Sequence, residues 1–132
     1  MQLISKQIGE IKKLLGALKH ESKLKTTLLI VEGMKDVQAL YNFGIQTNIL
    51  HLQGRPLIEI CDLAAAFKKI IILTDFDNAG QKLAKNLQQN LSFRGINVDL
   101  TYYHKLKFYF KKVSKDIESL FKIYQQIALP EN

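Results

Sequence analysis

Two acidic residues, separated by a single phenylalanine, follow the most apolar run of the chain. The run 70–74 leads directly into Asp75, Phe76 and Asp77. Two carboxylates this close repel each other and raise at least one pKa unless a cation, a proton or open solvent compensates. Carboxylate oxygens are also the ligands that a hard divalent cation such as Mg²⁺ prefers. We therefore expect this pair to hold a metal ion.

A second group of acids follows an earlier apolar run. Residues 27–31 have the composition of a buried strand. Glu32 and Gly33 come directly after it, and Asp36 follows three residues beyond Gly33. In open α/β sheets the functional crevice lies beyond the carboxyl ends of the strands. If the two strands are neighbours, Glu32 and the two later aspartates converge on one patch, with Asp36 one helical turn behind. Such a patch suits Mg²⁺, with Mn²⁺ as a substitute.

Continuous apolar strands alternate with helical patterns along the chain. Strands are expected at about 27–31, 48–52, 69–74 and 96–102, and helices at about 3–20, 35–43, 56–67, 79–93 and from Ser114 onward. This alternation predicts an α/β fold, a Rossmann-like and mostly parallel sheet of about four strands with helices on both faces. The first helix is amphipathic and precedes the sheet. We therefore divide the chain into an N-terminal helical extension, 1–25, and a main domain, 26–128.

The amino-acid composition excludes several classes of protein for this chain. A chain of 132 residues that is 47% hydrophobic can bury one core. The single cysteine, Cys61, excludes an internal disulfide and a cysteine-rich zinc site. Charged residues interrupt the N-terminal apolar positions, and no apolar run approaches membrane-spanning length. We expect a cytoplasmic protein without membrane association.

The charge balance favours a polyanionic partner. Nineteen Lys and Arg against twelve Asp and Glu give a formal net charge of +7. No acid occurs between Asp99 and Asp116, where lysines alternate with aromatic residues. Such a segment either contacts phosphates and unpaired bases, or is a strand end with buried aromatics and solvated lysines. The candidate nucleic-acid-binding residues are Lys35, Arg55, Lys105, Lys107, Lys111 and Lys112. For Arg55, in the turn 53–55, a plain exposed turn is the alternative.

The two acidic segments together resemble the Toprim domain, which topoisomerases, bacterial-type primases and ribosomal-RNA maturases share. The matching stretches are IVEGMKD and ILTDFDNAG, and the resemblance covers about residues 26–125. It implies that Glu32 is the general acid/base and that Asp75 and Asp77, with Glu32, hold Mg²⁺. It further implies that Gly33 and Gly80 allow close approach of backbone and phosphate. Asp116 resembles part of the acidic run after the last strand in maturases and primases, or it simply begins a helix.

These residues favour an Mg²⁺-dependent nuclease of maturase type, acting on RNA or DNA with RNA favoured by the resemblance. The alternative is a non-catalytic metal- and nucleic-acid-binding module that serves as subunit or scaffold in a repair or RNA-processing complex. The first helix could bind a protein partner or a second copy of the chain. A phosphatase with Asp75 as covalent nucleophile is a third reading. A calcium-binding EF-hand loop is excluded because Ala79 and Asn86 occupy its fifth and twelfth positions.

Overall fold

Four parallel strands form the centre of the molecule. The computed structural model describes residues 5–46, 48–112 and 114–128. The sheet order is β2-β1-β3-β4, and each neighbouring pair runs parallel. The strands are β1 (Thr27–Val31), β2 (Ile49–His51), β3 (Lys69–Leu73) and β4 (Val98–Asp99). The two central strands are almost entirely buried, as their continuous apolar sequences predict. The predicted α/β fold and strand number are confirmed.

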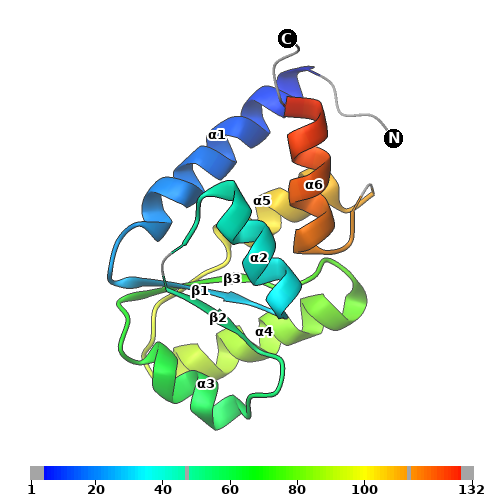
Figure 1. The fold of residues 1–132 in the computed structure, drawn as a ribbon. Coiled ribbons are helices and arrows are strands. Elements are labelled where there is room, and N and C mark those ends of the chain that lie inside the picture. The colour runs from blue at the N-terminus through cyan, green and yellow to red at the C-terminus, as the bar shows by residue number, and fades with distance from the viewer. Residues whose placement is uncertain (1–4, 47, 113, 129–132) are drawn as a thin grey trace.

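Helices cover both faces of this sheet (Figure 1). The helices α3 (Leu57–Ala64) and α4 (Asn78–Phe93) lie on one face, and α2 (Met34–Phe43) and α6 (Ile117–Ala128) pack together on the other. Helix α2 ends at Gly44, whose φ of 102° is the left-handed conformation that glycine accepts readily. In the part of the chain that the structure describes, no helix combines the length and the hydropathy needed to span a bilayer.

The predicted fourth strand is wrong over most of its length. Instead of extending from 96 to 102, β4 ends at Asp99, and α5 (Thr101–Phe110) takes over beside β3. The Asp99 side chain accepts a hydrogen bond from the backbone N–H of Thr101 at 2.8 Å, which favours the turn into the helix. Tyr103, Leu106 and Phe110 recur at helical spacing and are buried, so packing overrides the strand propensity of the aromatic residues.

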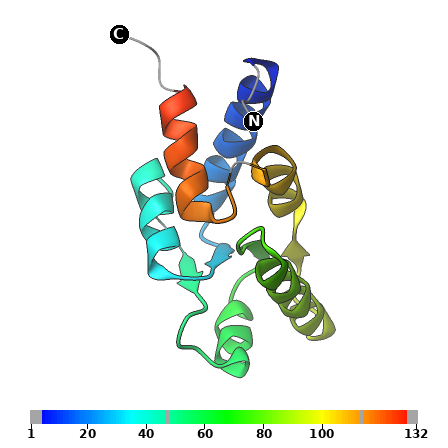
Figure 2. The ribbon, with the colours of Figure 1, turned by 90° about the vertical axis from the view of Figure 1, so that its right-hand side faces the viewer.

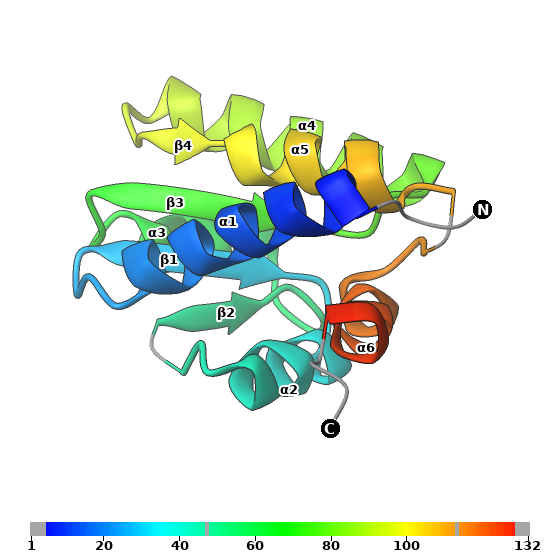
Figure 3. The ribbon, with the colours of Figure 1, turned by 90° about the horizontal axis from the view of Figure 1, so that it is seen from above.

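The first helix, α1 (Ser5–Ser22), packs directly onto the rest of the fold. Its predicted amphipathic character is confirmed, since Ile11, Leu15 and Leu18 are fully buried. The predicted beginning, at residues 3 and 4, lies outside the described residues. In the views of Figures 2 and 3, α1 lies on the same side of the sheet as α6 and beside α5.

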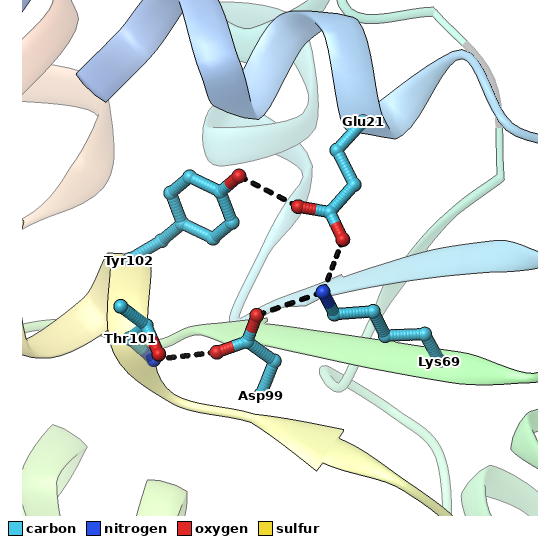
Figure 4. Close-up of polar contacts among 5 residues, drawn as sticks. All are labelled: Glu21, Lys69, Asp99, Thr101 and Tyr102. Atoms are coloured by element: carbon cyan, nitrogen blue, oxygen red, sulfur yellow. Dashed lines mark hydrogen bonds and ion pairs between the residues drawn. The ribbon is translucent and has the colours of Figure 1, made fainter. Parts of the chain in front are cut away.

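A polar network fastens the end of α1 to the sheet (Figure 4). The carboxylate of Glu21 accepts hydrogen bonds from the hydroxyl of Tyr102, at 2.6 Å, and from the ammonium group of Lys69. Lys69 also pairs with Asp99 at 3.0 Å. The hydrogen bond to Glu21 raises the pKa of Lys69 above its ordinary value. The network therefore joins α1, β3, β4 and α5 at the end of β3 that lies away from Asp75.

Candidate active site at the carboxyl ends of β1 and β3

Glu32 and Asp75 are in direct contact, as the sequence predicts. Val31 of β1 lies opposite Leu73 of β3, so the residues that follow these strands leave the sheet side by side. The backbone N–H of Asp75 donates a hydrogen bond of 2.6 Å to Oε2 of Glu32. This bond fixes the Glu32 carboxylate at the strand end and brings it against the Asp75 side chain.

The side chain of Asp75 lies among other acids. Its pKa is raised from 3.8 to about 7, first because burial removes water from the carboxylate, and then because Glu32 and Asp36 are negatively charged. Within the described part of the chain, the buried Oδ1 atom of Asp75 has no hydrogen-bond partner. A buried acceptor without a partner is costly, and a bound cation would satisfy it. The carboxylate pair of Glu32 and Asp75 therefore fits a hard divalent cation.

Asp36 links the site to α6. Its side chain is buried, and Oδ2 accepts from the backbone N–H of Gly33 at 3.2 Å, which caps the first turn of α2. Its other oxygen, Oδ1, accepts from the backbone N–H of Glu118 at 3.2 Å. Burial raises the pKa of Asp36 even though these two hydrogen bonds lower it. Asp36 thus holds the beginning of α6 beside the Glu32 and Asp75 pair.

Asp116 caps α6 close to the other acids, and its predicted supporting role in the site stays a prediction. Its Oδ1 accepts from the backbone N–H of Ser119 at 2.7 Å, which caps α6. The chain just before it is tied to the end of β3, because the N–H of Phe76 donates to the carbonyl of Lys115 at 2.6 Å. The charge of Asp116 contributes to the raised pKa values of Asp36 and Asp75. It is therefore both a helix cap and an electrostatic neighbour of the site.

Asp77 lies differently from the other acids. Its exposed side chain caps α4 by accepting from the N–H of Gly80 at 2.7 Å. Among the described residues, no set of three or more His, Cys, Asp or Glu side chains is arranged to hold a metal ion. The acids therefore do not form a complete protein cage. Mg²⁺ commonly uses one or two carboxylates together with water and substrate phosphate, so metal binding by Asp77 stays a prediction.

The turn from β3 into α4 is held tightly. The hydroxyl of Thr74 donates to the carbonyl of Gly80 at 2.7 Å, and the amide of Gln81 donates to the carbonyl of Phe76 at 2.8 Å. A Cβ atom added at Gly80 would lie 2.0 Å from the carbonyl oxygen of Asp75. Gly80 is thus required for the backbone of α4 to approach Asp75, whether or not a phosphate is present.

Tyr103 is a positioning residue that the sequence did not reveal. Its hydroxyl donates to the backbone carbonyl of Asp75 at 2.7 Å, and its ring packs against Phe76 with centroids 5.5 Å apart. The only sequence signal is its helical spacing with Leu106 and Phe110, and that signal is hidden when the segment is read as a strand. Tyr103 holds the carbonyl of Asp75, while Glu32 holds its N–H.

A cleft of about 890 Å³ opens beside the acids. The acids Glu32, Asp36, Asp75 and Asp116 and the cations Lys35 and Arg55 share it with an apolar wall formed by Leu52, Leu57, Ile60, Leu83 and Leu87. Arg55 is oriented by the carbonyl of His51 and by an ion pair with Glu59, both at 3.1 Å. Two of the predicted cations therefore lie in the same cleft as the acids.

The lysines and aromatic residues of α5 do not form one surface. Lys105 lies in a groove against α1, whereas Lys107 lies in a groove against α4. Tyr103 and Phe110 are buried, and the hydroxyls of Tyr102 and Tyr109 bind Glu21 and Glu10. Among the described aromatic residues of α5, Phe108 is the most exposed, at 79%, and its ring lies edge-on to that of Tyr109 with centroids 5.3 Å apart. Lys111 and Lys112 are exposed at the end of α5.

Comparison with known proteins agrees with this geometry. The model of the Toprim domain family matches residues 27–115, from the first residue of β1 to the segment before α6. That match contains both strand ends and both acidic segments. The chain belongs to the Toprim family.

Relatives of this Toprim chain occur in archaea. A UPF0292 protein of Thermococcus gammatolerans is 39% identical over 100 residues, which cover 76% of this chain and 75% of the relative. A UPF0292 protein of Methanocaldococcus jannaschii is 36% identical over 106 residues, which cover 79% of this chain and 81% of that protein. A solved structure of a protein from Aquifex aeolicus matches with a TM-score of 0.68 and 28% identity, covering 90% of this chain and 99% of that one.

The raised pKa of Asp75 predicts an unusual pH dependence in metal-free protein. Between its ordinary pKa of 3.8 and about 7, the folded state holds a proton that the unfolded state has released. Stability should therefore fall as the pH rises through this interval. Asparagine cannot ionise and its amide can donate to Glu32. After allowance for solvent screening, we expect Asp75→Asn to stabilise the chelator-treated protein by about 1–2 kcal/mol at about pH 8.

Urea denaturation in chelator, at about pH 5 and about pH 8, measures this effect. The two proteins should differ little at the lower pH and clearly at the higher one. Equal stabilities of wild type and Asp75→Asn at both pH values would show that the Asp75 carboxyl carries no burial penalty.

Proposed function

We propose that this Toprim chain is an Mg²⁺-dependent nuclease that cleaves phosphodiester bonds, with RNA favoured over DNA. The observation that carries the proposal is the half-buried Asp75 carboxylate, whose buried Oδ1 has no partner among the described residues, and whose backbone N–H donates to Glu32. Toprim domains typically bind Mg²⁺ through acidic residues. A pure binder of polyanions gains nothing from buried acids at its contact surface unless a cation neutralises them.

The residues of the site divide into three roles. Glu32 and Asp75 would hold Mg²⁺, with Asp77 as a further candidate, and a metal there would polarise the phosphodiester and stabilise the leaving oxygen. Glu32, held in place by the N–H of Asp75, moves a proton to or from the reacting oxygen. Lys35 and Arg55 lie in the same cleft, where their charges bind phosphate.

A non-catalytic metal- and nucleic-acid-binding module is the second candidate. One observation favours it: the cations Lys35 and Arg55 lie in the same cleft as the acids, and binding of phosphate by these cations does not require catalysis. Such a module would use the cleft for recognition within a larger repair or RNA-processing complex. This second candidate predicts that Asp75→Asn still binds nucleic acid.

The deciding experiment measures cleavage of end-labelled structured RNA, single-stranded DNA and duplex DNA with Mg²⁺, Mn²⁺ or chelator. The proposal predicts cleavage that requires a divalent cation and is lost in Asp75→Asn. The matched control is Asp62→Asn, because Asp62 is 70% exposed on α3 and pairs with Arg94 outside the cleft. It should cleave like wild type. Binding without metal-dependent cleavage on every substrate would overturn the nuclease and support the second candidate.

A further inference from the structure

A second groove, of about 390 Å³, lies between α4 and α5. Its floor is largely apolar and includes Ala84, Leu100 and Tyr103, and its polar side chains are basic or carry amides, whereas the polar side chains of the cleft beside Glu32 are mostly acidic. The side chains that give it this character are Gln81, Lys82, Lys85, Gln88, His104 and Lys107. None of the described residues that line it is acidic. A groove with this composition suits an anionic ligand with several oxygen acceptors.

The charges of this groove are not neutralised by the protein. Lys82 and Lys85 are exposed and three residues apart on α4, so they lie on one face of the helix. Lys107 faces them from α5, where its ammonium group contacts the side-chain oxygen of Gln81 at 3.4 Å. Within the described part of the chain, none of the three forms an ion pair, whereas Arg55, Lys69, Arg94 and Lys122 each pair with a carboxylate.

The groove adjoins the strand end that carries Asp75. Tyr103 lines the groove and donates its hydroxyl to the backbone carbonyl of Asp75. Helix α4 forms one wall of both the acidic cleft and the groove. Leu83 and Leu87 line the cleft, and Lys82 and Lys85 line the groove. Figure 1 shows α4 on one side of the sheet and α5 on the other, and Leu100, which follows the edge strand β4, lines the groove between them. A strand crossing the first turns of α4 would therefore reach both.

We propose that the groove between α4 and α5 binds the sugar-phosphate backbone of a nucleic-acid strand whose reacting phosphate lies at Asp75. This deepens the proposed function and rests on it. Lys82, Lys85 and Lys107 contact successive phosphates, and the amides of Gln81 and Gln88 supply hydrogen bonds to phosphate or sugar oxygens. The contact carries no base specificity, because the charges read only the backbone.

The test measures binding of fluorescein-labelled single-stranded RNA and DNA by anisotropy, in chelator and over a series of salt concentrations. The double variant Lys82→Gln/Lys85→Gln is compared with Lys6→Gln/Lys12→Gln, which removes the same charge from exposed positions on α1. The groove variant should lose about tenfold or more in affinity, and its salt slope should fall by about 1.4, which is about 0.7 for each lost contact to a single strand. The α1 variant should stay close to wild type.

Equal losses in the two double variants, or no binding by the wild type, would overturn this inference. So would equally tight binding of poly-glutamate, since the groove would then be a general polyanion surface. The result is separable from the nuclease test because chelator prevents cleavage. If cleavage depends on Glu32 but Lys82→Gln/Lys85→Gln binds nucleic acid as tightly as the α1 variant, only the proposal for the groove is overturned. Binding through these lysines without any cleavage would overturn only the nuclease, leaving the groove as a strand-binding site beside Asp75.

Discussion

Replacing Glu32 with glutamine should lower the rate of Mg²⁺-dependent cleavage by about 10²–10⁴-fold, the usual contribution of a positioned acid or base. The side-chain oxygen of glutamine can still accept the 2.6 Å hydrogen bond from the N–H of Asp75, so the strand end keeps its structure. The variant cannot transfer a proton. It also lacks the negative charge that Glu32 would place beside a bound metal ion. Single-turnover rates with saturating enzyme measure the effect on the chemical step.

Glu118→Gln is the matched control for this prediction. Glu118 lies in the same cleft, but its carboxylate pairs with Lys122 at 2.9 Å rather than with Asp75. The change should leave the rate near that of wild type. A wild-type rate in Glu32→Gln, together with loss of cleavage in Asp75→Asn, would contradict the role of Glu32 and leave Asp75 as the essential carboxylate.

The sequence predicts the parallel sheet and the meeting of Glu32 with Asp75 for one physical reason. Strands buried on both faces are continuous apolar runs, and the carboxyl ends of neighbouring parallel strands share an edge. The same reasoning cannot tell whether Asp77 binds a metal ion or caps the next helix, because aspartate after a strand suits both roles. Only the structure shows that its oxygen accepts from Gly80.

Contacts between distant segments explain what the sequence could not predict. The alternation of lysine with aromatic residues after Asp99 suits a strand, yet Tyr103 and Leu106 pack as a helical face. The hydrogen bond from Glu118 to Asp36 joins residues 82 apart. Lys82 and Lys85 look like an ordinary solvated helix face until α5 forms the second wall of their groove.

Gly80→Ala should lower the free energy of unfolding by about 3 kcal/mol, near the upper end for overpacked positions. The added methyl group would lie 2.0 Å from the carbonyl oxygen of Asp75, 2.6 Å from its carbonyl carbon and 2.9 Å from its Cα. All three are backbone atoms, so no flexible side chain can move aside. Relief requires the β3–α4 turn to open, which would break the bond from Thr74 to the Gly80 carbonyl.

Gly16→Ala separates this steric effect from the general effect of alanine in a helix. Gly16 is exposed in α1, and a Cβ atom there would meet nothing within 4 Å. Alanine should stabilise that helix by about 0.5–1 kcal/mol, so the two substitutions have opposite signs. Urea denaturation of both variants measures these changes in the free energy of unfolding. Destabilisation of Gly80→Ala by less than about 1 kcal/mol would mean that the turn yields without cost. Asp75 would then be held chiefly by Glu32 and Tyr103, which bind its backbone N–H and carbonyl.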